Sequence, residues 1–305
     1  MKKDLISIND LTTKEIKELF DLTDKLKRNK ARFGKVLAGK TLALIFQKPS
    51  NRTRVSFEVG MFQLGGHSLY LAPNEINLGV RESIADVAKT LSRYIDGIVI
   101  RTFEHKNCLE LAKEATVPVI NGLSDFSHPC QALADLYTVK EKLKALKGLT
   151  LAYVGDGNNV CNSLLFICAK LGVNMNVGCP VGYEPSAAVF KDAKAAAEAG
   201  AAKINLFNDA SSAVKGADIV YTDVWASMGQ EDEAAKRKEA FKDFQVNQEL
   251  VKLAKPKALI MHCLPAHRGE EITADVLDSQ NAVVFDEAEN RMHVQKAVLI
   301  KLLGR

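Results

Sequence analysis

The sequence predicts an α/β protein built from two doubly wound parallel-sheet domains that are joined by long helices. Short apolar runs of strand length alternate with helical patterns along the 305-residue chain. This alternation restarts near residue 149, and a chain of this length is expected to form about two domains. We therefore expect domains at 1–135 and 136–285, with a C-terminal helix over 286–305 that packs back on the first domain.

The first half of the chain begins with a predicted helix, because Thr12 and Glu15 have the spacing of a helix capping box. The apolar residues that follow this box recur at helical spacing. Further along, each short apolar run predicts a strand, and each amphipathic segment between runs predicts a helix. The expected strands are 42–46, 68–71, 97–100 and 117–120, and the expected helices between them begin after Ser50 and cover about 83–94 and 107–115.

A long helix is predicted from Pro129 to about Lys147, because proline suits the first position of a helix and the following apolar residues keep a helical period. The second half then repeats the alternation. An alanine-rich segment over 187–202 predicts a helix, and the last helix is expected to begin near Glu287. The expected strands of this half are 149–154, 174–177, 203–206, 218–221, 258–262 and 282–285.

The composition, with 47% hydrophobic and 26% charged residues, is typical of a folded globular protein. The net charge is +4 and no basic run is long enough for a nucleic-acid arm, so we expect no nucleic-acid partner. We expect no membrane association, because the N-terminus lacks a signal-peptide pattern and no segment approaches ~20 apolar residues. The six cysteines form no C-x-x-C pair and the six histidines no ligand cluster, which predicts a cytoplasmic protein without a metal site.

A polar segment, Ser50-Asn51-Arg52-Thr53-Arg54, separates the first predicted strand from the next helix. Backbone N–H groups at a helix start, hydroxyl groups and a guanidinium group are the parts that bind a phosphate dianion. A serine cap followed by solvated arginines would give the same pattern. The segment is therefore a candidate phosphate site, with the plain helix cap as the alternative.

Two further candidates lie in the first half. Arg101 comes at the end of the 97–100 run, where the carboxyl end of a parallel strand faces the usual ligand crevice. His128 and Gln131 flank the start of the long helix, so their imidazole and amide groups can point at one ligand oxygen. The alternatives are an ordinary surface arginine and a histidine that only caps its helix.

The turn Gly155-Asp156-Gly157 in the second half suggests a dinucleotide-binding loop. The suggestion fails, because position 160 is Val rather than Gly and no isolated acidic residue follows ~20 positions on to hold a ribose. We therefore expect a Rossmann-type turn without a dinucleotide.

Two polar segments follow predicted strands of the second half, where α/β proteins place their ligands. One begins at Asp223 and contains Ser227 and Met228, and the other begins at His262 and contains Cys263. The alternatives are that Asp223 only caps a loop and that Cys263 only fills the core.

Together, these segments resemble the motifs of the transcarbamoylase family, and most closely those of its ornithine carbamoyltransferases. The resemblance runs over nearly the whole chain. Residues 50–54 are similar to the family's S-T-R-T-R motif, and residues 128–131 match its H-P-x-Q motif. Residues 223–229 resemble the D-x-x-x-S-M-G loop and residues 262–265 the H-C-L-P motif, which point to ornithine rather than aspartate as the acceptor.

The resemblance implies transfer of the carbamoyl group of carbamoyl phosphate to the δ-amine of L-ornithine, which gives L-citrulline and phosphate. This reaction serves arginine biosynthesis, or arginine catabolism in reverse. The resemblance also implies that no cofactor or metal is needed and that the chain forms a homotrimer or a multiple of trimers. The implied catalytic residues are Arg52, Arg101, His128, Asp223 and Cys263. The implied carbamoyl-phosphate contacts are Ser50, Asn51, Arg52, Thr53, Asn77, Arg101, His128, Gln131, Cys263, Leu264 and Arg291, and the implied ornithine contacts are Asn159, Asp223, Ser227 and Met228.

Two positions depart from the family pattern. Asn51 replaces the usual threonine, which keeps a backbone N–H for the phosphate but removes a hydroxyl group. Asn77 lies in a segment that resembles the family's loop from a neighbouring subunit, and it stands where some relatives carry Gln or His. Its side chain is shorter than either of those. Neither departure removes a charge.

Other acceptors and other classes of protein are alternatives. Putrescine, an N-acylated ornithine or aspartate would keep the same chemistry. Aspartate is disfavoured because the loop at Ser227 and the thiol of Cys263 do not suit a second carboxylate. The glycine spacing disfavours a dinucleotide-dependent oxidoreductase, and the presence of both halves of the site disfavours a non-catalytic binding protein.

Overall fold

The computed structural model describes residues 1–226 and 231–304, and the chain divides into two compact units. Unit 1 comprises Met1–Ala134 and Glu289–Arg305, and unit 2 comprises Asp135–Ala288. Two long helices, α6 (Pro129–Leu143) and α13 (Val284–Leu303), each contain one of the divisions between the units.

Unit 1 is built on a parallel sheet with the strand order β2-β1-β3-β4. The chain runs from β1 outward to β2 and then returns to β3 on the other side of β1. Strand order therefore reverses between β1 and β3, which is where open α/β sheets bind ligands beyond the carboxyl ends of their strands. The strands are β1 (Thr41–Phe46), β2 (His67–Leu71), β3 (Gly97–Arg101) and β4 (Val119–Leu123).

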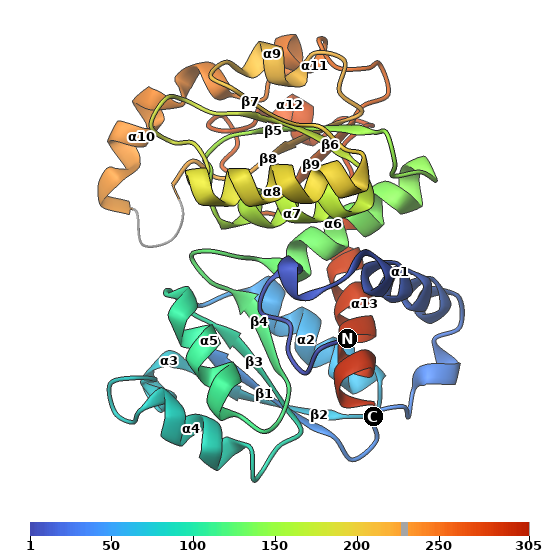
Figure 1. Ribbon diagram of the computed structural model, residues 1–305, viewed down its shortest axis with the longest axis vertical. Helices are drawn as coiled ribbons and strands as arrows, with labels where there is room; N and C mark the ends of the chain where they lie inside the picture. The colour runs from blue at the N-terminus through green and yellow to red at the C-terminus, as the bar shows by residue number, and fades with distance from the viewer. Residues whose placement is uncertain (227–230, 305) are drawn as a thin grey trace. The chain divides into compact units, whose positions relative to one another are not determined.

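Helices cover the unit 1 sheet (Figure 1). On one face, α4 (Ile84–Leu91) and α5 (His105–Glu114) share an apolar core with β1, β3 and β4. Gly97 of β3 leaves room for Leu303 of α13, because a Cβ atom there would lie 3.1 Å from the leucine Cδ1. The predicted capping box exists, since Thr12 Oγ1 accepts from the Glu15 N–H of α1. The remaining elements are α1 (Thr13–Arg28), α2 (Asn51–Gln63), α3 (Pro73–Ile76) and the 3-10 helices Ile8–Asp10 and Ala31–Phe33.

Unit 2 is built on a second parallel sheet with the strand order β7-β6-β5-β8-β9. The chain runs outward from β5 through β6 to β7 and then returns to β8 on the other side of β5. The reversal of strand order, and hence the expected ligand position, lies between β5 and β8. The strands are β5 (Thr150–Val154), β6 (Asn174–Gly178), β7 (Ile204–Phe207), β8 (Ile219–Thr222) and β9 (Leu259–His262).

Helices also lie on both faces of the unit 2 sheet (Figure 1). Two long helices, α7 (Asn159–Leu171) and α8 (Ala187–Gly200), cover one face, and shorter helices cover the other. The second face packs on an aromatic core in which Trp225 stacks on Phe241 with ring centroids 5.9 Å apart. The shorter elements are α9 (Ala210–Val214), α10 (Ala234–Ala240), α11 (Gln248–Val251), α12 (Ala274–Leu277) and the 3-10 helices Glu231–Glu233 and Lys242–Phe244.

The predicted fold class of two parallel-sheet domains is confirmed. The predicted strand at 282–285 is wrong, because α13 already begins at Val284 and Ala282 makes only an isolated bridge to Ile260. The apolar run was misleading, since the acidic residues Asp286 and Glu287 that follow it lie in the first turn of the helix, where negative charge is favourable.

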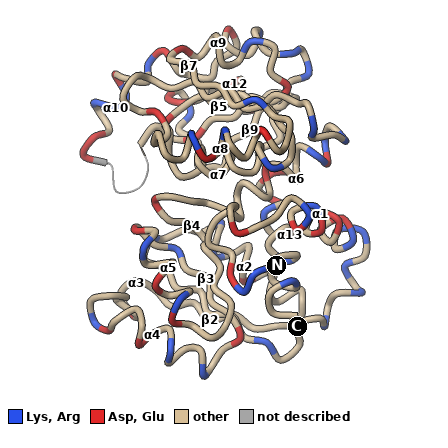
Figure 2. Tube along the Cα trace, in the orientation of Figure 1, with Lys and Arg blue, Asp and Glu red and all other residues tan. Residues whose placement is uncertain are grey.

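Charges of both signs are interspersed along each unit (Figure 2). Among the described residues, no helix is long and apolar enough to cross a membrane.

Candidate functional site

In unit 1, the polar segment after β1 forms the start of α2. Ser50 is the N-cap residue, and its Oγ accepts a hydrogen bond from the Thr53 N–H at 3.2 Å. Asn51 and Arg52 occupy the first two positions of the helix and are exposed. The first turn of α2 therefore combines the positive end of a helix with a guanidinium group, beside the reversal of strand order.

Three arginines approach this helix start from different parts of unit 1. Arg291 of α13 donates from Nη2 to the Thr53 Oγ1 at 2.9 Å, and both residues are buried. Arg101 ends β3, the strand next to β1, and is only 5% exposed. Arg52 supplies the third positive charge. The structure thus brings Arg52, Arg101 and Arg291 together although they are far apart in sequence.

His128 lies among these arginines and is 4% exposed. Burial and the positive charges of Arg291, Arg101 and Arg52 hold the pKa of its imidazole well below the usual value. His128 is therefore neutral at physiological pH. Gln131 follows at the start of α6, is 1% exposed, and donates its backbone N–H to the His128 carbonyl oxygen at 3.1 Å.

Asn77 is a further predicted residue of unit 1. It is exposed at the end of α3 and has a left-handed backbone with φ of 41°. The residue after Asn77 is hydrogen-bonded to the residue that follows β1. Gln47 Nε2 donates to the Leu78 carbonyl oxygen at 3.1 Å.

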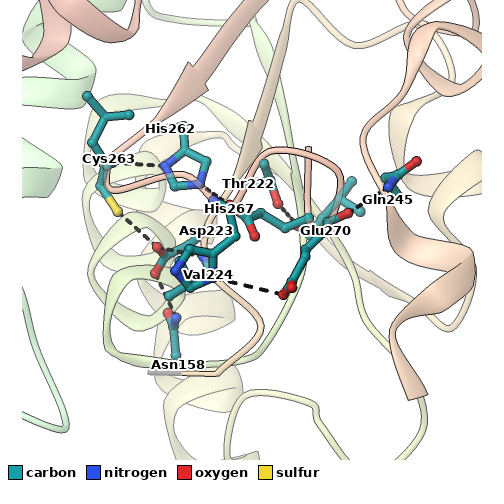
Figure 3. Close-up of polar contacts among 12 residues, drawn as sticks. Asn158, Thr222, Asp223, Val224, Gln245, His262, Cys263, His267 and Glu270 are labelled. Atoms are coloured by element: carbon teal, nitrogen blue, oxygen red, sulfur yellow. Dashed lines mark hydrogen bonds and ion pairs between the residues drawn. The ribbon is translucent and has the colours of Figure 1, made fainter. Parts of the chain in front are cut away.

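In unit 2, Asp223 directly follows β8 and Cys263 directly follows β9, the neighbouring strand. The Cys263 thiol donates to Asp223 Oδ1 at 3.0 Å (Figure 3). The same oxygen accepts the Val224 N–H at 2.8 Å. Asp223 is 5% exposed whereas Cys263 is partly exposed. The pair lies at the carboxyl ends of strands on one side of the strand-order reversal.

Asn158 completes the contacts of the Asp223 carboxylate and was missed by the sequence prediction, which singled out its neighbour Asn159. Its Nδ2 donates to Asp223 Oδ2 at 2.8 Å (Figure 3). Its Oδ1 caps α7 by accepting the N–H groups of Val160 and Cys161 at 2.9 and 3.1 Å. The cap fixes the orientation of the amide, so the amino group must face Asp223.

The pKa of the Cys263 thiol lies well above its usual value. Exclusion of water is the main cause, and the carboxylate of Asp223 and the acids Glu287 and Asp135 add to it. Burial and Asp135 in turn raise the pKa of Glu287 well above its usual value. Cys263 is therefore a protonated hydrogen-bond donor at neutral pH.

The structure describes two of the four remaining predicted residues of unit 2, Asn159 and Leu264. Asn159 is buried at the first position of α7, beside the cap residue Asn158. Leu264 follows Cys263 and adopts a left-handed backbone with φ of 58°. Ser227 and Met228 lie outside the described residues.

The turn at residues 155–157 has a structural purpose that differs from dinucleotide binding. A Cβ atom on Gly157 would lie 2.2 Å from the backbone nitrogen of Pro185, so glycine is needed for the approach of the chain itself. The Gly157 N–H donates to the Tyr183 carbonyl oxygen at 2.8 Å. The chain's own backbone thus makes the close approach that a pyrophosphate makes in a dinucleotide site.

A buried ion pair on the same turn was also missed. Arg237 of α10 is 7% exposed, lies 3.0 Å from Asp156 Oδ2, and donates to the Trp225 carbonyl oxygen at 3.0 Å. Burial outweighs the charge of Arg237 and raises the pKa of Asp156 to about 6. No local sequence signal pairs these residues, because 81 positions separate them.

Among the described residues, Asp223, His262 and Cys263 offer ligand atoms that suit a metal ion and lie within 4.8 Å of one another. Both His262 ring nitrogens already have partners, the Leu264 N–H and Glu271. Metal binding would require the ring to release one of them and the thiol to lose its proton.

Comparison with known proteins gives the class of protein. Residues 3–141 match the family model of the aspartate/ornithine carbamoyltransferase carbamoyl-phosphate-binding domain, and residues 147–302 match that of the aspartate/ornithine-binding domain. The chain belongs to the aspartate/ornithine carbamoyltransferase family.

Within this family, similar proteins along the full chain are named ornithine carbamoyltransferases. The Thermococcus kodakarensis enzyme is 55% identical over 99% of this chain and 96% of its own. An anabolic ornithine carbamoyltransferase from Pyrococcus furiosus is 55% identical over the same shares. The solved P. furiosus structure has a TM-score of 0.96 at 54% identity over 99% of this chain and 97% of that chain, and the Thermus thermophilus structure has 0.90 at 46% identity over 99% of both.

Proposed function

We propose that this chain is an ornithine carbamoyltransferase, which transfers the carbamoyl group of carbamoyl phosphate to the δ-amine of L-ornithine and releases L-citrulline and phosphate. The observation that decides between the acceptors in the family description is the Asp223 carboxylate beside the Cys263 thiol. A buried carboxylate attracts the ammonium group of ornithine and repels the second carboxylate of aspartate. The names of the full-length relatives support the same choice.

For carbamoyl phosphate, we propose binding by Ser50, Asn51, Arg52, Thr53, Asn77, Arg101, His128, Gln131, Cys263, Leu264 and Arg291. The arginines neutralise the phosphate dianion, and their planar guanidinium groups each grip two oxygens. The N–H groups at the start of α2 add further donors for the phosphate.

Neutral His128 suits the carbonyl oxygen of the carbamoyl group. An imidazole that stays neutral donates one hydrogen bond without giving up a proton to the departing phosphate. Such a donor stabilises the negative charge that develops on the carbonyl oxygen during attack. Gln131 follows three residues later at the start of α6, and we propose that its side chain adds an amide donor.

For ornithine, we propose that Asn159, Asp223, Ser227 and Met228 hold the amino-acid end. Asp223 is oriented by three donors, from Asn158, Val224 and Cys263, so its charge has a fixed position before the substrate arrives. Such preorganisation places the δ-amine for attack on the carbonyl carbon. Carbamoyl phosphate is an activated mixed anhydride, so orientation and charge stabilisation suffice for the chemistry we propose.

The proposal is tested by citrulline formation from carbamoyl phosphate with ornithine, putrescine, N-acetylornithine and aspartate as parallel acceptors. A strong preference for ornithine is the expected result. Preference for another acceptor would keep the assignments in unit 1 and overturn those in unit 2. No activity with any acceptor would leave a binding protein that has kept the fold.

We further propose that the chain acts as a homotrimer, or a multiple of trimers, in the cytoplasm. Val55, Val59 and Phe62 form an exposed apolar stripe along one side of α2, with exposed fractions of 54, 37 and 80%. A stripe of this kind favours association with another copy. The cytoplasmic location is supported by six cysteines that form no disulfide. Light scattering of the purified protein should give three times the chain mass, or a multiple of it.

A further inference from the structure

His262 is a fully buried histidine beside the proposed ornithine residues, and nothing in the proposed reaction uses its ring. It is the last residue of β9 and directly precedes Cys263. Its backbone N–H donates to Glu287 Oε2 at 3.2 Å, so the main chain at this point is held from inside the unit.

Both ring nitrogens of His262 have partners, and these partners fix the tautomer. Nδ1 lies 2.8 Å from the Leu264 backbone nitrogen, and Nε2 lies 3.0 Å from Glu271 Oε1. Because a backbone N–H can only donate, Nδ1 must be the acceptor and the ring proton must sit on Nε2. His262 is thus a bridge that accepts from Leu264 and donates to Glu271.

Glu271, which accepts from the His262 ring, is itself held in place by further hydrogen bonds. It is 0% exposed, and the Oε1 that meets His262 also accepts the His267 N–H at 2.6 Å. Its carbonyl oxygen accepts the Val246 N–H at 2.8 Å, which ties the residue to the aromatic core of unit 2. One carboxylate oxygen therefore holds both the start and the end of the loop from residue 262 to residue 267.

The hydrogen bond that His262 Nδ1 accepts from the Leu264 N–H constrains an unfavourable backbone conformation at Leu264. Leu264 has φ of 58°, a left-handed conformation that is unfavourable for a leucine and persists only when the surroundings impose it. The hydrogen bond from its N–H to His262 is such a constraint. Because Cys263 lies between the two residues, the same bond restricts the direction of its side chain towards Asp223 Oδ1.

We propose that His262 is a positioning residue: its ring, held by Glu271, fixes the backbone of Leu264 and so keeps the Cys263 thiol on the Asp223 carboxylate. The kinetic consequence rests on the proposed function, since it assumes that Asp223 and Cys263 serve ornithine. The positional consequence, that His262 keeps the Cys263 thiol on Asp223, does not rest on the proposed function, because the reactivity of the thiol is measurable without substrate.

Two substitutions separate the two sides of the bridge. In His262→Asn, the side-chain oxygen lies at the same bond distance from Cβ as Nδ1 and can accept from Leu264, while the contact with Glu271 is lost. In His262→Gln, the amide nitrogen matches Nε2 and can donate to Glu271, while the acceptor for Leu264 is lost. His262→Asn therefore leaves the buried Glu271 carboxylate without the donor that the histidine ring supplied, whereas His262→Gln keeps a donor for it.

The substrate-free measurement is alkylation of the native protein by iodoacetamide at pH 8. Cys263 is partly exposed whereas the other five cysteines are buried, so Cys263→Ser supplies the background rate. Held against Asp223, the thiol resists ionisation, and release from the carboxylate exposes a thiolate that reacts faster. We expect His262→Gln to react at least about threefold faster than the wild type and His262→Asn to stay within about twofold.

The second measurement is kcat/KM for ornithine together with the melting temperature. We expect His262→Gln to lose about 10- to 100-fold in kcat/KM, and His262→Asn to stay within about threefold although it melts at the lower temperature. A merely structural histidine would make activity follow melting temperature, which is the opposite order. If His262→Asn fails to fold, its double variant with Glu271→Gln removes the buried charge and carries the same comparison.

Equal alkylation rates for the two variants, or activity losses that follow their melting temperatures, would overturn the proposal. A wild-type protein that forms no citrulline would instead overturn the proposed function. The alkylation comparison would then still decide whether His262 positions Cys263, so the two failures are distinguishable.

Discussion

The Cys263 thiol donates a hydrogen bond of 3.0 Å to the Asp223 carboxylate, across the ends of two paired strands. The contact gives each residue a defined chemical state. Burial, and after it the carboxylate of Asp223, raises the pKa of the thiol, so the sulfur is a donor and a poor nucleophile at neutral pH. The thiol in turn occupies one lone pair of Asp223 and leaves its negative charge to attract a cation.

Replacing Cys263 tests the value of this donor. Cys263→Ala should lower kcat/KM for ornithine by about 10- to 100-fold, because a hydrogen bond to a charged group contributes ~1.5 to 3 kcal/mol. Cys263→Ser keeps a hydroxyl donor and should lose less than the alanine variant. Initial rates of citrulline formation measure both losses, and equal losses in the two variants would show that the hydrogen bond is not what matters.

Replacing Arg101 tests the proposed phosphate site. Arg101→Leu removes one of three guanidinium groups around His128 and should raise KM for carbamoyl phosphate at least about tenfold. Arg101→Lys keeps the charge without the planar fork and should have an intermediate KM. Circular dichroism checks that both variants fold. An unchanged kcat/KM in the leucine variant would remove Arg101 from the site.

The parts of the fold that sequence predicts well are those set by local pattern. Strands such as β1 and β5 are short apolar runs between polar turns, and the box at Thr12 marks the start of α1 directly. The 282–285 run failed because a short apolar stretch fits a strand or a helix start equally well. Tertiary contacts decide such cases.

The candidate site likewise contains residues that local sequence motifs predict and residues that only the tertiary structure reveals. His128 and Cys263 stand in ordered motifs, so they were predictable, whereas the partners that set their chemistry come from distant positions. Arg291 meets Thr53 across 238 positions, and Asn158 meets Asp223 across 65. The one local signal that was available is the position of Asn158 after a glycine turn, which is typical of a helix N-cap.

Asn158 should act on ornithine through Asp223. Asn158→Ser keeps a cap for α7 but removes the amino group that donates to Asp223 Oδ2, so KM for ornithine should rise about 10-fold with little change in melting temperature. Asn158→Ala removes both contacts and should also lower stability by about 1 kcal/mol. Similar ornithine kinetics in the serine variant and the wild type would confine Asn158 to the cap.

Activity should rise with pH, because only the neutral δ-amine of ornithine can attack. An amine with a lysine-like pKa of ~10.4 is only about 0.04% neutral at pH 7. The lowered pKa of His128 keeps its imidazole neutral throughout this range, so its titration does not oppose the rise. The measurement is kcat/KM for ornithine from pH 6 to 9, and a flat profile with chemistry rate-limiting would contradict it.

The buried pair of Asp156 and Arg237 should make stability depend on pH. Burial raises the pKa of Asp156 from 3.8 to about 6, so the folded protein holds this proton more tightly than the unfolded chain does. The stabilisation from the bound proton is complete below pH ~4 and is lost as the pH rises through about 6. Asp156→Asn has no such proton, so its free energy of unfolding relative to the wild type should rise by about 2 kcal/mol from pH 4 to 7. Denaturant unfolding of both proteins at several pH values measures this difference. Parallel pH curves would mean that the charge of Arg237 fully compensates the burial of Asp156.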